Sequence, residues 1–256
     1  MRTAWLLLCL PHVALAAPWL RSEGVATSSR GDLLYREVHW RRDAAEGAER
    51  WVLYQCADGR PFARKHLPAS ADPQARGYTL EDRRSGQKAD VEAASGRVSI
   101  AWKEDAGSPP VQRELDLPTG AVIDAGFDAA VRLHWQALMR GERVTLPFLV
   151  PARQRYFPVQ VRRIGPQRWQ GIDAQSIEVS LDTWYGGGIA PRLALVYASA
   201  DQRLLEFRGT SNLRDQRGAY PQVTVRFIAA AAGRPASEWQ QAWARPLTDR
   251  CTVTAR

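Results

Sequence analysis

The chain has 256 residues, with 35 Lys and Arg against 27 Asp and Glu, a formal net charge of +8, and three cysteines. Its length is enough for one large domain or two small ones. No cysteine lies in a C-x-x-C or zinc-ligand spacing and no histidine in an H-E-x-x-H or H-x-H spacing, so nothing in the sequence indicates a metal site, a redox centre or a cofactor.

The N-terminus has the pattern of a secretory signal peptide. The segment MRTAWLLLCLPHVALAAPW combines a basic start, an apolar run and the small-residue sequence Ala14-Leu15-Ala16. It is too short to serve as a permanent membrane-spanning helix. We therefore expect a signal peptide over residues 1–16, cleavage after Ala16, a periplasmic protein and no transmembrane anchor. An uncleaved anchor is the alternative.

The charge of the remaining chain is unevenly distributed. Between Arg140 and Arg168 there are seven arginines and one acid, Glu142, a local net charge of +6. An exported protein rarely meets nucleic acid, so we expect no nucleic-acid partner. The anions within its reach are lipid head groups and other anionic surfaces of the cell envelope. A solvated strand face is the alternative explanation of these arginines.

The first half of the chain reads as β-structure. Residues 21–32 are polar, and we expect them to form a lead-in without regular structure. Six short runs follow, several of them alternating apolar and polar residues, at residues 33–40, 51–55, 62–67, 78–83, 97–103 and 111–117. Turn residues such as Asp58-Gly59 and Ser95-Gly96 separate them. The spacing predicts antiparallel strands joined by hairpins, with one face buried.

The middle of the chain has the periodicity of one amphipathic helix. Asp124 is a suitable N-cap and Gly141 a suitable C-cap, which predicts a helix over residues 125–140. At about 100° per residue, its two faces separate by polarity. The polar face carries Asp128, Arg132, Gln136 and Arg140, and the apolar face carries Phe127, Ala130, Val131, His134, Trp135 and Leu138. Such a face needs an apolar surface to lie on.

The β pattern then resumes, at residues 144–151, 157–164, 175–181, 193–199, 204–210 and 222–228. A short C-terminal helix is expected at residues 237–244, where Ser237 and Gln240 match a capping box. An antiparallel sheet of about ten or more strands is too large to stay flat. We therefore predict a mainly β (α+β) protein with one domain over residues 17–256. Its large curved antiparallel sheet forms a half-barrel or open barrel, with the central helix across the concave side.

Two cysteines remain after the signal peptide, Cys56 and Cys251. In an oxidising compartment they can form a disulfide, which would close a very long loop. The alternative is two separate thiols, and the sequence leaves both open.

Catalytic patterns are weak throughout the chain. Ser211 lies in a Gly-Thr-Ser-Asn sequence that lacks the second glycine of a nucleophile elbow. Glu81 and Asp82 are adjacent on a predicted strand and so point to opposite faces, which argues against a glycosidase pair. His134 and His66 are the candidates for a hydrolase or transferase. For His134, in the middle of the apolar helix face, a core histidine is the alternative.

Two resemblances bear on the fold and function. The segments DAGFDAAVRLHWQAL, PFLVPAR and YQCADGRPFARK are similar to parts of an uncharacterised group of exported proteobacterial proteins. A signal peptide, a large antiparallel sheet and one mid-chain helix resemble the LolA-like periplasmic half-barrel proteins. That resemblance implies a fold in which acyl chains are held between a curved sheet and a helical lid. It covers the architecture of most of the chain but includes no diagnostic motif, and this chain is longer and richer in tryptophan.

Three functions are compatible with these observations. In the first, the protein binds an apolar or amphipathic ligand, such as a lipid or acyl chain, between the sheet and the helix. The cavity lining is then expected to be Phe127, Val131, His134, Trp135, Leu138, Phe148 and Val150. An anionic head group would meet Arg153, Arg155, Arg162 and Arg163. In the second, the protein is a non-catalytic envelope interaction module with a filled core. In the third, it is a periplasmic hydrolase using His134 or His66.

Overall fold

The computed structural model describes residues 18–44, 47–181 and 192–251. The predicted signal peptide, residues 1–16, and its cleavage site lie outside the described residues. Sixteen strands of the described chain form one sheet. Those of the first half are β1 (Trp19–Thr27), β2 (Leu33–Ala44), β3 (Gly47–Gln55), β4 (Pro61–Leu67), β5 (Tyr78–Asp82), β6 (Lys88–Ala94), β7 (Arg97–Lys103) and β8 (Val111–Asp116).

The second half holds the remaining strands and the helices. The strands are β9 (Val122–Ile123), β10 (Val144–Val150), β11 (Arg155–Trp169), β12 (Ile172–Leu181), β13 (Arg192–Ala198), β14 (Leu204–Thr210), β15 (Gln222–Arg226) and β16 (Ala232–Arg234). The α-helices are α1 (Phe127–Leu133), α2 (Trp135–Met139) and α3 (Ala236–Ala244), and two short 3-10 helices are η1 (Asp124–Gly126) and η2 (Pro151–Arg153).

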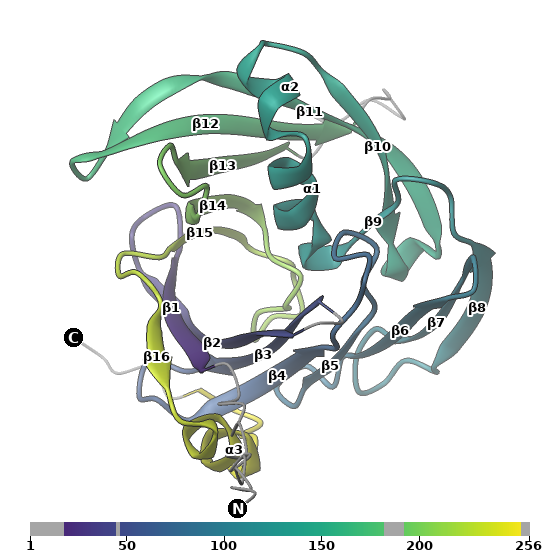
Figure 1. Ribbon diagram of the computed structural model, residues 1–256. Coiled ribbons are helices and arrows are strands. Elements are labelled where there is room, and N and C mark those ends of the chain that lie inside the picture. The colour runs from purple at the N-terminus through teal and green to yellow at the C-terminus, as the bar shows by residue number, and fades with distance from the viewer. Residues whose placement is uncertain (1–17, 45–46, 182–191, 252–256) are drawn as a thin grey trace, which may run out of the picture.

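The sheet consists of two antiparallel meanders. Strands β1 to β8 pair in chain order, and so do β10 to β15. The pairing of β15 with β1, where Val25 lies opposite Arg226, joins the meanders into one sheet. Its ends are β8 and β9, and β9 pairs in parallel with β10. The sheet curls around α1 (Figure 1), so the predicted large curved antiparallel sheet with a helix on its concave side is confirmed.

The strand β1 was not predicted, because residues 21–32 were expected to lack regular structure. Its two faces are both partly polar, so hydrophobicity does not mark it as a strand. Arg21 pairs with Glu23 and with Glu238 of the C-terminal helix, on the convex face, whereas Gly24 faces Phe227 on the concave side. A Cβ on Gly24 would come within 2.8 Å of the Phe227 ring. The pairing partners β2 and β15 on either side therefore define this strand.

The central helix is present but bent. It begins with η1, continues as α1 and α2, and is interrupted at His134, whose φ is −94° and ψ 11°. Backbone hydrogen bonds cross the interruption, from His134 N–H to Ala130 O and from Leu138 N–H to His134 O, both 3.0 Å. We therefore treat α1 and α2 as one bent unit, the α1–α2 segment.

The ends of this segment test the predicted caps. The C-cap residue is Arg140, and the predicted cap Gly141 directly follows it, with φ +85° and its N–H bonded to Leu138 O. The N-cap prediction was wrong: Asp124 lies inside η1 with φ +46°, and no side chain caps the helix. The Asp124 carboxylate instead accepts hydrogen bonds from the Lys65 ammonium group at 2.8 and 3.0 Å. The carboxylate that was expected to cap the helix is thus paired with the buried Lys65 ammonium group.

The short helix α3 lies outside the curved sheet (Figure 1), where it packs against β3 and the Trp40 indole N–H of β2 donates to Glu238. It begins one residue before the predicted 237, after Pro235, and no side chain caps it. Trp239 stacks on Trp51 at 4.6 Å between ring centroids, and Trp51 stacks on His66 at 3.7 Å. The convex face therefore carries its own aromatic cluster. Within the described ranges no helix has the length and apolar character needed to cross a membrane.

A disulfide joins Cys56, in the turn after β3, to Cys251 near the end of the described chain. The two cysteines are 195 residues apart in the sequence. Beside this bond, Thr248 N–H donates to Pro61 O at 2.8 Å. The C-terminal segment is therefore fastened to the β3–β4 turn, which settles the pairing that the sequence left open.

Candidate ligand-binding site

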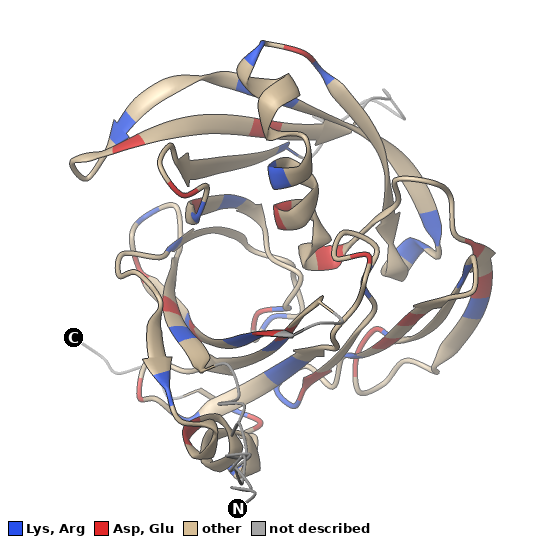
Figure 2. Ribbon diagram, in the orientation of Figure 1, with Lys and Arg blue, Asp and Glu red and all other residues tan. Residues whose placement is uncertain are grey.

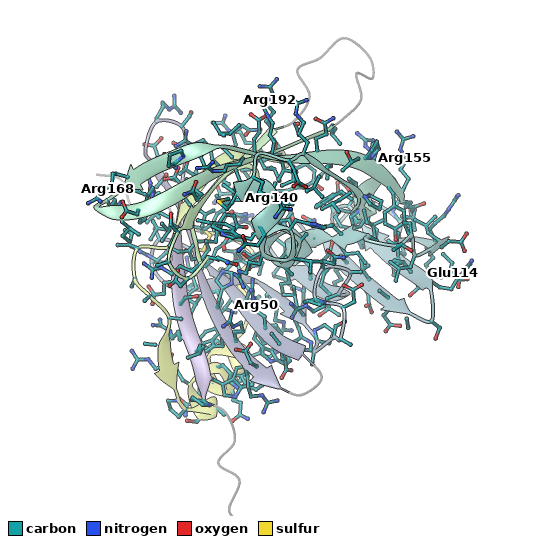
Figure 3. All side chains as sticks on the ribbon, turned by 45° about the horizontal axis from the view of Figure 1, so that its top comes forward. Arg50, Glu114, Arg140, Arg155, Arg168 and Arg192 are labelled. Atoms are coloured by element: carbon teal, nitrogen blue, oxygen red, sulfur yellow. A yellow bond between two sulfur atoms is a disulfide. The ribbon has the colours of Figure 1, made fainter. Side chains whose placement is uncertain are left out.

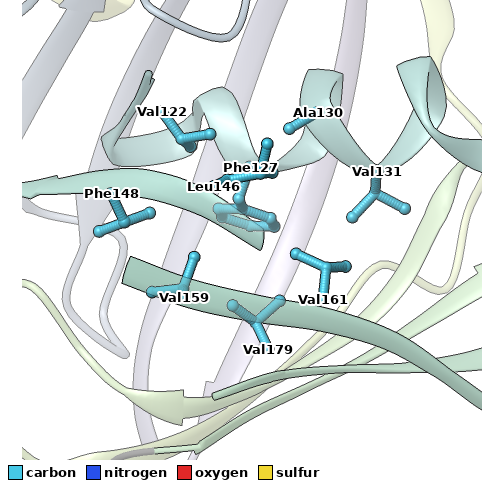
Figure 4. A pocket seen from close by; sticks show the side chains of 9 residues that line it. All are labelled: Val122, Phe127, Ala130, Val131, Leu146, Phe148, Val159, Val161 and Val179. Atoms are coloured by element: carbon cyan, nitrogen blue, oxygen red, sulfur yellow. The ribbon is translucent and has the colours of Figure 1, made fainter. Parts of the chain in front are cut away.

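The α1–α2 segment lies on an apolar seam formed by the concave faces of β10, β11, β12 and β13. Between them remains a cavity of about 10 Å³, shown in Figure 4. Its lining is entirely apolar and consists of Val122, Phe127, Ala130, Val131, Leu146, Phe148, Val159, Val161 and Val179. A space of this size holds about one water molecule. The seam is therefore packed, and within the described part of the chain no ligand-sized space lies under the helix.

The predicted lining residues are only partly brought together. Phe127, Val131 and Phe148 line the cavity. Trp135 and Leu138 are buried in the same apolar cluster but do not border the cavity. The remaining two, His134 at the bend and Val150 at the end of β10, are half-buried outside that lining.

The four predicted head-group arginines do not converge. Arg153 and Arg155 are exposed at the β10–β11 turn, where the Arg155 guanidinium lies over the Phe157 ring. Arg162 and Arg163 are neighbours on β11 and so point to opposite faces. Arg162 pairs with Glu178 at 2.8 Å, and Arg163 Nε donates to Gln175 at 2.7 Å. In Figure 3, Arg155 and Arg168 lie at opposite ends of β11.

A charged cluster lies on the concave side beside the apolar seam. Asp128 of α1 accepts a hydrogen bond from Arg132 at 2.6 Å, and the Arg50 guanidinium of β3 is 3.7 Å from the same carboxylate oxygen. Both signs of charge lie along the helix and on the strands around it (Figure 2). We call the following residues the concave-face cluster: Arg50, Arg76, Asp128, Arg132 and Tyr197.

Burial shifts the pKa values of two members of this cluster, Arg76 and Tyr197. Arg76, in the β4–β5 loop, is 8% exposed and donates to Ala48 O. Burial lowers the pKa of Arg76 to about 10, and the nearby charge of Arg50 acts in the same direction. Tyr197 of β13 is fully buried, and burial, followed by the charge of Asp128, raises the pKa of its hydroxyl well above the usual value. Tyr197 is therefore a neutral hydroxyl beside a carboxylate.

A second buried ion pair fastens the start of the helical segment to the sheet. Lys65 of β4 and Asp124 of η1 are both nearly inaccessible to solvent, with side chains 4% and 11% exposed. Asn212, from the β14–β15 loop, donates to the same carboxylate at 3.0 Å. Gly126 then passes the β4–β5 loop so closely that a Cβ would meet Gln74 O at 1.9 Å. These contacts fix the N-terminal end of the segment against two loops.

Sequence reasoning missed most of these polar groups. Asp128 was assigned to the solvent-facing side of the helix, but it is 7% exposed. Its i,i+4 spacing from Arg132 is the one local signal of the pair. Arg50 and Arg76 occupy ordinary polar positions of a strand and a loop. Only the curvature of the sheet brings them to the helix.

The two histidine candidates lie on opposite sides of the sheet. His66 stacks against Trp51 on the convex face and contacts Glu49 at 3.1 Å. His134 belongs to the α1–α2 segment on the concave side. Ser211 is a buried turn residue whose Oγ accepts from Leu213 N–H and contacts the Tyr35 hydroxyl. Within the part of the chain that is described, no group of three or more His, Cys, Asp or Glu residues is arranged to hold a metal ion.

Comparisons with known proteins identify a similar fold. No family model matches the chain, and no curated protein matches it. The fold is similar to the crystal structure of a β-barrel-like protein from Brucella abortus, a member of the domain of unknown function DUF1849. The match has a TM-score of 0.52 and 11% identity, and it covers 87% of this chain and 100% of that protein. At this identity the likeness establishes a β-barrel-like fold and nothing about activity.

Proposed function

We propose that this protein is an exported, non-catalytic binding protein that takes up an apolar or amphipathic ligand between the α1–α2 segment and the concave face of the sheet. The observation that carries the proposal is the seam itself. The helical segment and the strands beneath it together contribute nine apolar lining residues, beside a charged cluster, which is the composition of an amphipathic ligand site. The resemblance to LolA-like half-barrel proteins agrees with this position of the ligand.

Ligand entry requires the α1–α2 segment to move. Ligand pockets typically measure roughly 300–1,000 Å³, whereas the seam leaves about 10 Å³. Helices of seven and five residues are marginal without tertiary packing, because isolated helices shorter than about 12–15 residues are unstable in water. The segment is therefore held by its side-chain contacts. An apolar chain that replaces the sheet contacts of the segment would compensate for much of their loss.

The proposed periplasmic location rests on the signal-peptide pattern and on the disulfide. A Cys56–Cys251 bond fits an oxidising compartment, and β1 begins at Trp19, shortly after the proposed cleavage site. N-terminal sequencing of protein recovered from the periplasm of a Gram-negative host is expected to begin at Ala17. Recovery of a chain that still begins at Met1 would contradict the processing.

The binding function can be tested with a neutral fluorescent probe, N-phenyl-1-naphthylamine, and displacement by hexadecanol. We expect saturable binding of one probe per chain. Ala130→Leu places a larger side chain in the seam and should weaken binding, since Ala130 lines the cavity. Ala129→Leu is the matched control, because Ala129 is half-buried on the same helix and does not border the cavity.

A second candidate function is the non-catalytic interaction module with a filled core, and the small volume of the seam favours it. In that case neither the probe nor hexadecanol binds the wild-type chain, and both leucine variants behave alike. This result would refute the binding proposal in favour of a structural role for the α1–α2 segment.

A further inference from the structure

The concave-face cluster has more positive charge than the apolar seam beside it can explain. Arg50, Arg76 and Arg132 face a single carboxylate, that of Asp128, so these four groups carry a net charge of +2. Removing guanidinium groups from water is costly unless they are paired. Such a surplus on the concave side of a fold is the property expected of a site for an anion.

The cluster also has unused hydrogen-bonding capacity. The 3.7 Å separation between Arg50 Nη2 and Asp128 Oδ2 is too long for a hydrogen bond. Among the described residues, the Arg76 Nε–H has no hydrogen-bond partner although it is buried. The side chains of Arg50 and Arg132 are 20% and 34% exposed, so solutes can reach the cluster from solvent. Donors are therefore present, partly accessible and incompletely satisfied.

The position of Asp128 relates this cluster to the apolar seam. Its neighbour Phe127 lines the cavity, as does Val131 one turn further along α1. Tyr197 connects the two regions, since it lies beside Asp128 and packs against Trp135 with ring centroids 6.1 Å apart. An apolar chain in the seam would thus have its polar end near the place that the Asp128 carboxylate occupies.

We propose that the concave-face cluster binds the carboxylate of a long-chain fatty acid, in exchange with Asp128. This inference rests on the proposed binding function and specifies its ligand class. When α1 moves to admit the chain, Asp128 moves with it, and the ligand carboxylate takes its place against Arg50 and Arg76. Arg132 lies on α1 as well and moves with Asp128, so Arg50 and Arg76 exchange one carboxylate for another. Planar guanidinium groups suit a carboxylate, and the neutral Tyr197 hydroxyl supplies a further donor.

The test compares hexadecanoate with hexadecanol, which have chains of equal length and differ in the head group. The wild-type chain should bind hexadecanoate at least about tenfold more tightly than hexadecanol, as charge-assisted hydrogen bonds to the carboxylate imply. Arg50→Gln should abolish this preference, with the hexadecanoate affinity falling to that of hexadecanol. Asp128→Asn should increase hexadecanoate affinity several-fold, because it removes the competing carboxylate. Arg168→Gln, at the end of the β11–β12 hairpin, is the control and should bind like wild type.

The possible outcomes distinguish failure of the carboxylate site from failure of the proposed binding function. Equal affinity for both molecules in the wild-type chain, or an undiminished preference in Arg50→Gln, would overturn the carboxylate site and leave the apolar site in place. Weaker hexadecanoate binding in Asp128→Asn would also overturn it. Failure of both molecules to bind wild type would refute the binding function itself. If Arg50→Gln does not fold, as judged by circular dichroism, Arg76→Gln provides the same comparison.

Discussion

At the scale of single residues, the Lys65–Asp124 pair is the clearest case of a buried charge that the fold must keep paired. Burial alone would raise the pKa of Asp124, but the Lys65 charge and the hydrogen bonds from Lys65, the Ala125 N–H and Asn212 hold it below the usual value. Because the native pKa is depressed, the pair stabilises the fold above the unfolded pKa, near 3.8. This contribution decreases as the pH falls through the native pKa.

Asp124→Asn should therefore destabilise the protein near neutral pH. Removing one partner of a buried ion pair costs about 3–5 kcal/mol, since the other charge stays buried. The difference in unfolding free energy between wild type and variant, measured by urea denaturation, should shrink as the pH is lowered below about 4. A difference that is independent of pH would show that the charge of Asp124 is not what holds η1.

Residue identities in the seam were partly predictable, whereas those of the charged cluster were not. Helical periodicity assigned Phe127, Val131, Trp135 and Leu138 to one buried face, and all four contribute to the apolar cluster. The same periodicity placed Asp128 in solvent, because a helical wheel cannot register that the sheet curls around more than one side of the helix. Arg50 and Asp128 are far apart in the sequence, so no local pattern indicates that they lie close together.

At the scale of elements, the α1–α2 segment combines strong tertiary contacts with little stability of its own. Its existence, its approximate limits and the glycine that ends it followed from the sequence, because periodicity and a glycine at positive φ are local properties. The bend at His134 and the displaced Asp124 depend on contacts with the sheet and with Lys65. The segment therefore keeps its position chiefly through the side chains that it buries.

Two leucines of the α1–α2 segment provide a matched test of whether buried side chains hold it in place. Leu138 is fully buried and Leu133 is 68% exposed. Leu138→Ala should lower the free energy of unfolding by about 2–5 kcal/mol, whereas Leu133→Ala should change it by less than about 0.5 kcal/mol. Chemical denaturation of both variants measures the difference. Similar small effects at both positions would mean that the segment is not packed on the seam.

At the scale of the whole molecule, two long-range connections hold the chain together. The β1–β15 pairing joins the two meanders, and the Cys56–Cys251 bond fastens the C-terminal segment to the β3–β4 turn. The curved antiparallel architecture was predictable from alternation and turn spacing. The joining of the two meanders through β1 was not predictable, because both faces of that strand are partly polar and its partners define it.

The disulfide should be a major source of stability. In the chain-entropy model, a bond that closes a loop of this length contributes about 5 kcal/mol by restricting the unfolded chain. A Cys56→Ser, Cys251→Ser double variant should unfold at lower urea concentration than the oxidised wild type. Wild type measured with a reductant should shift toward the double variant. Unchanged stability after reduction would contradict this role of the bond.

The central claim, that a ligand chain lies between the α1–α2 segment and the sheet, can be tested most directly through Trp135. This side chain is buried in the apolar cluster of the seam, whereas Trp239 lies in the aromatic cluster on the convex face. The measurement is quenching of tryptophan fluorescence by hexadecanoate brominated along its chain, with unbrominated hexadecanoate as reference. We predict quenching that is reduced in Trp135→Phe and retained in Trp239→Phe. Quenching that persists in Trp135→Phe and disappears in Trp239→Phe would place the chain on the convex face and contradict the account.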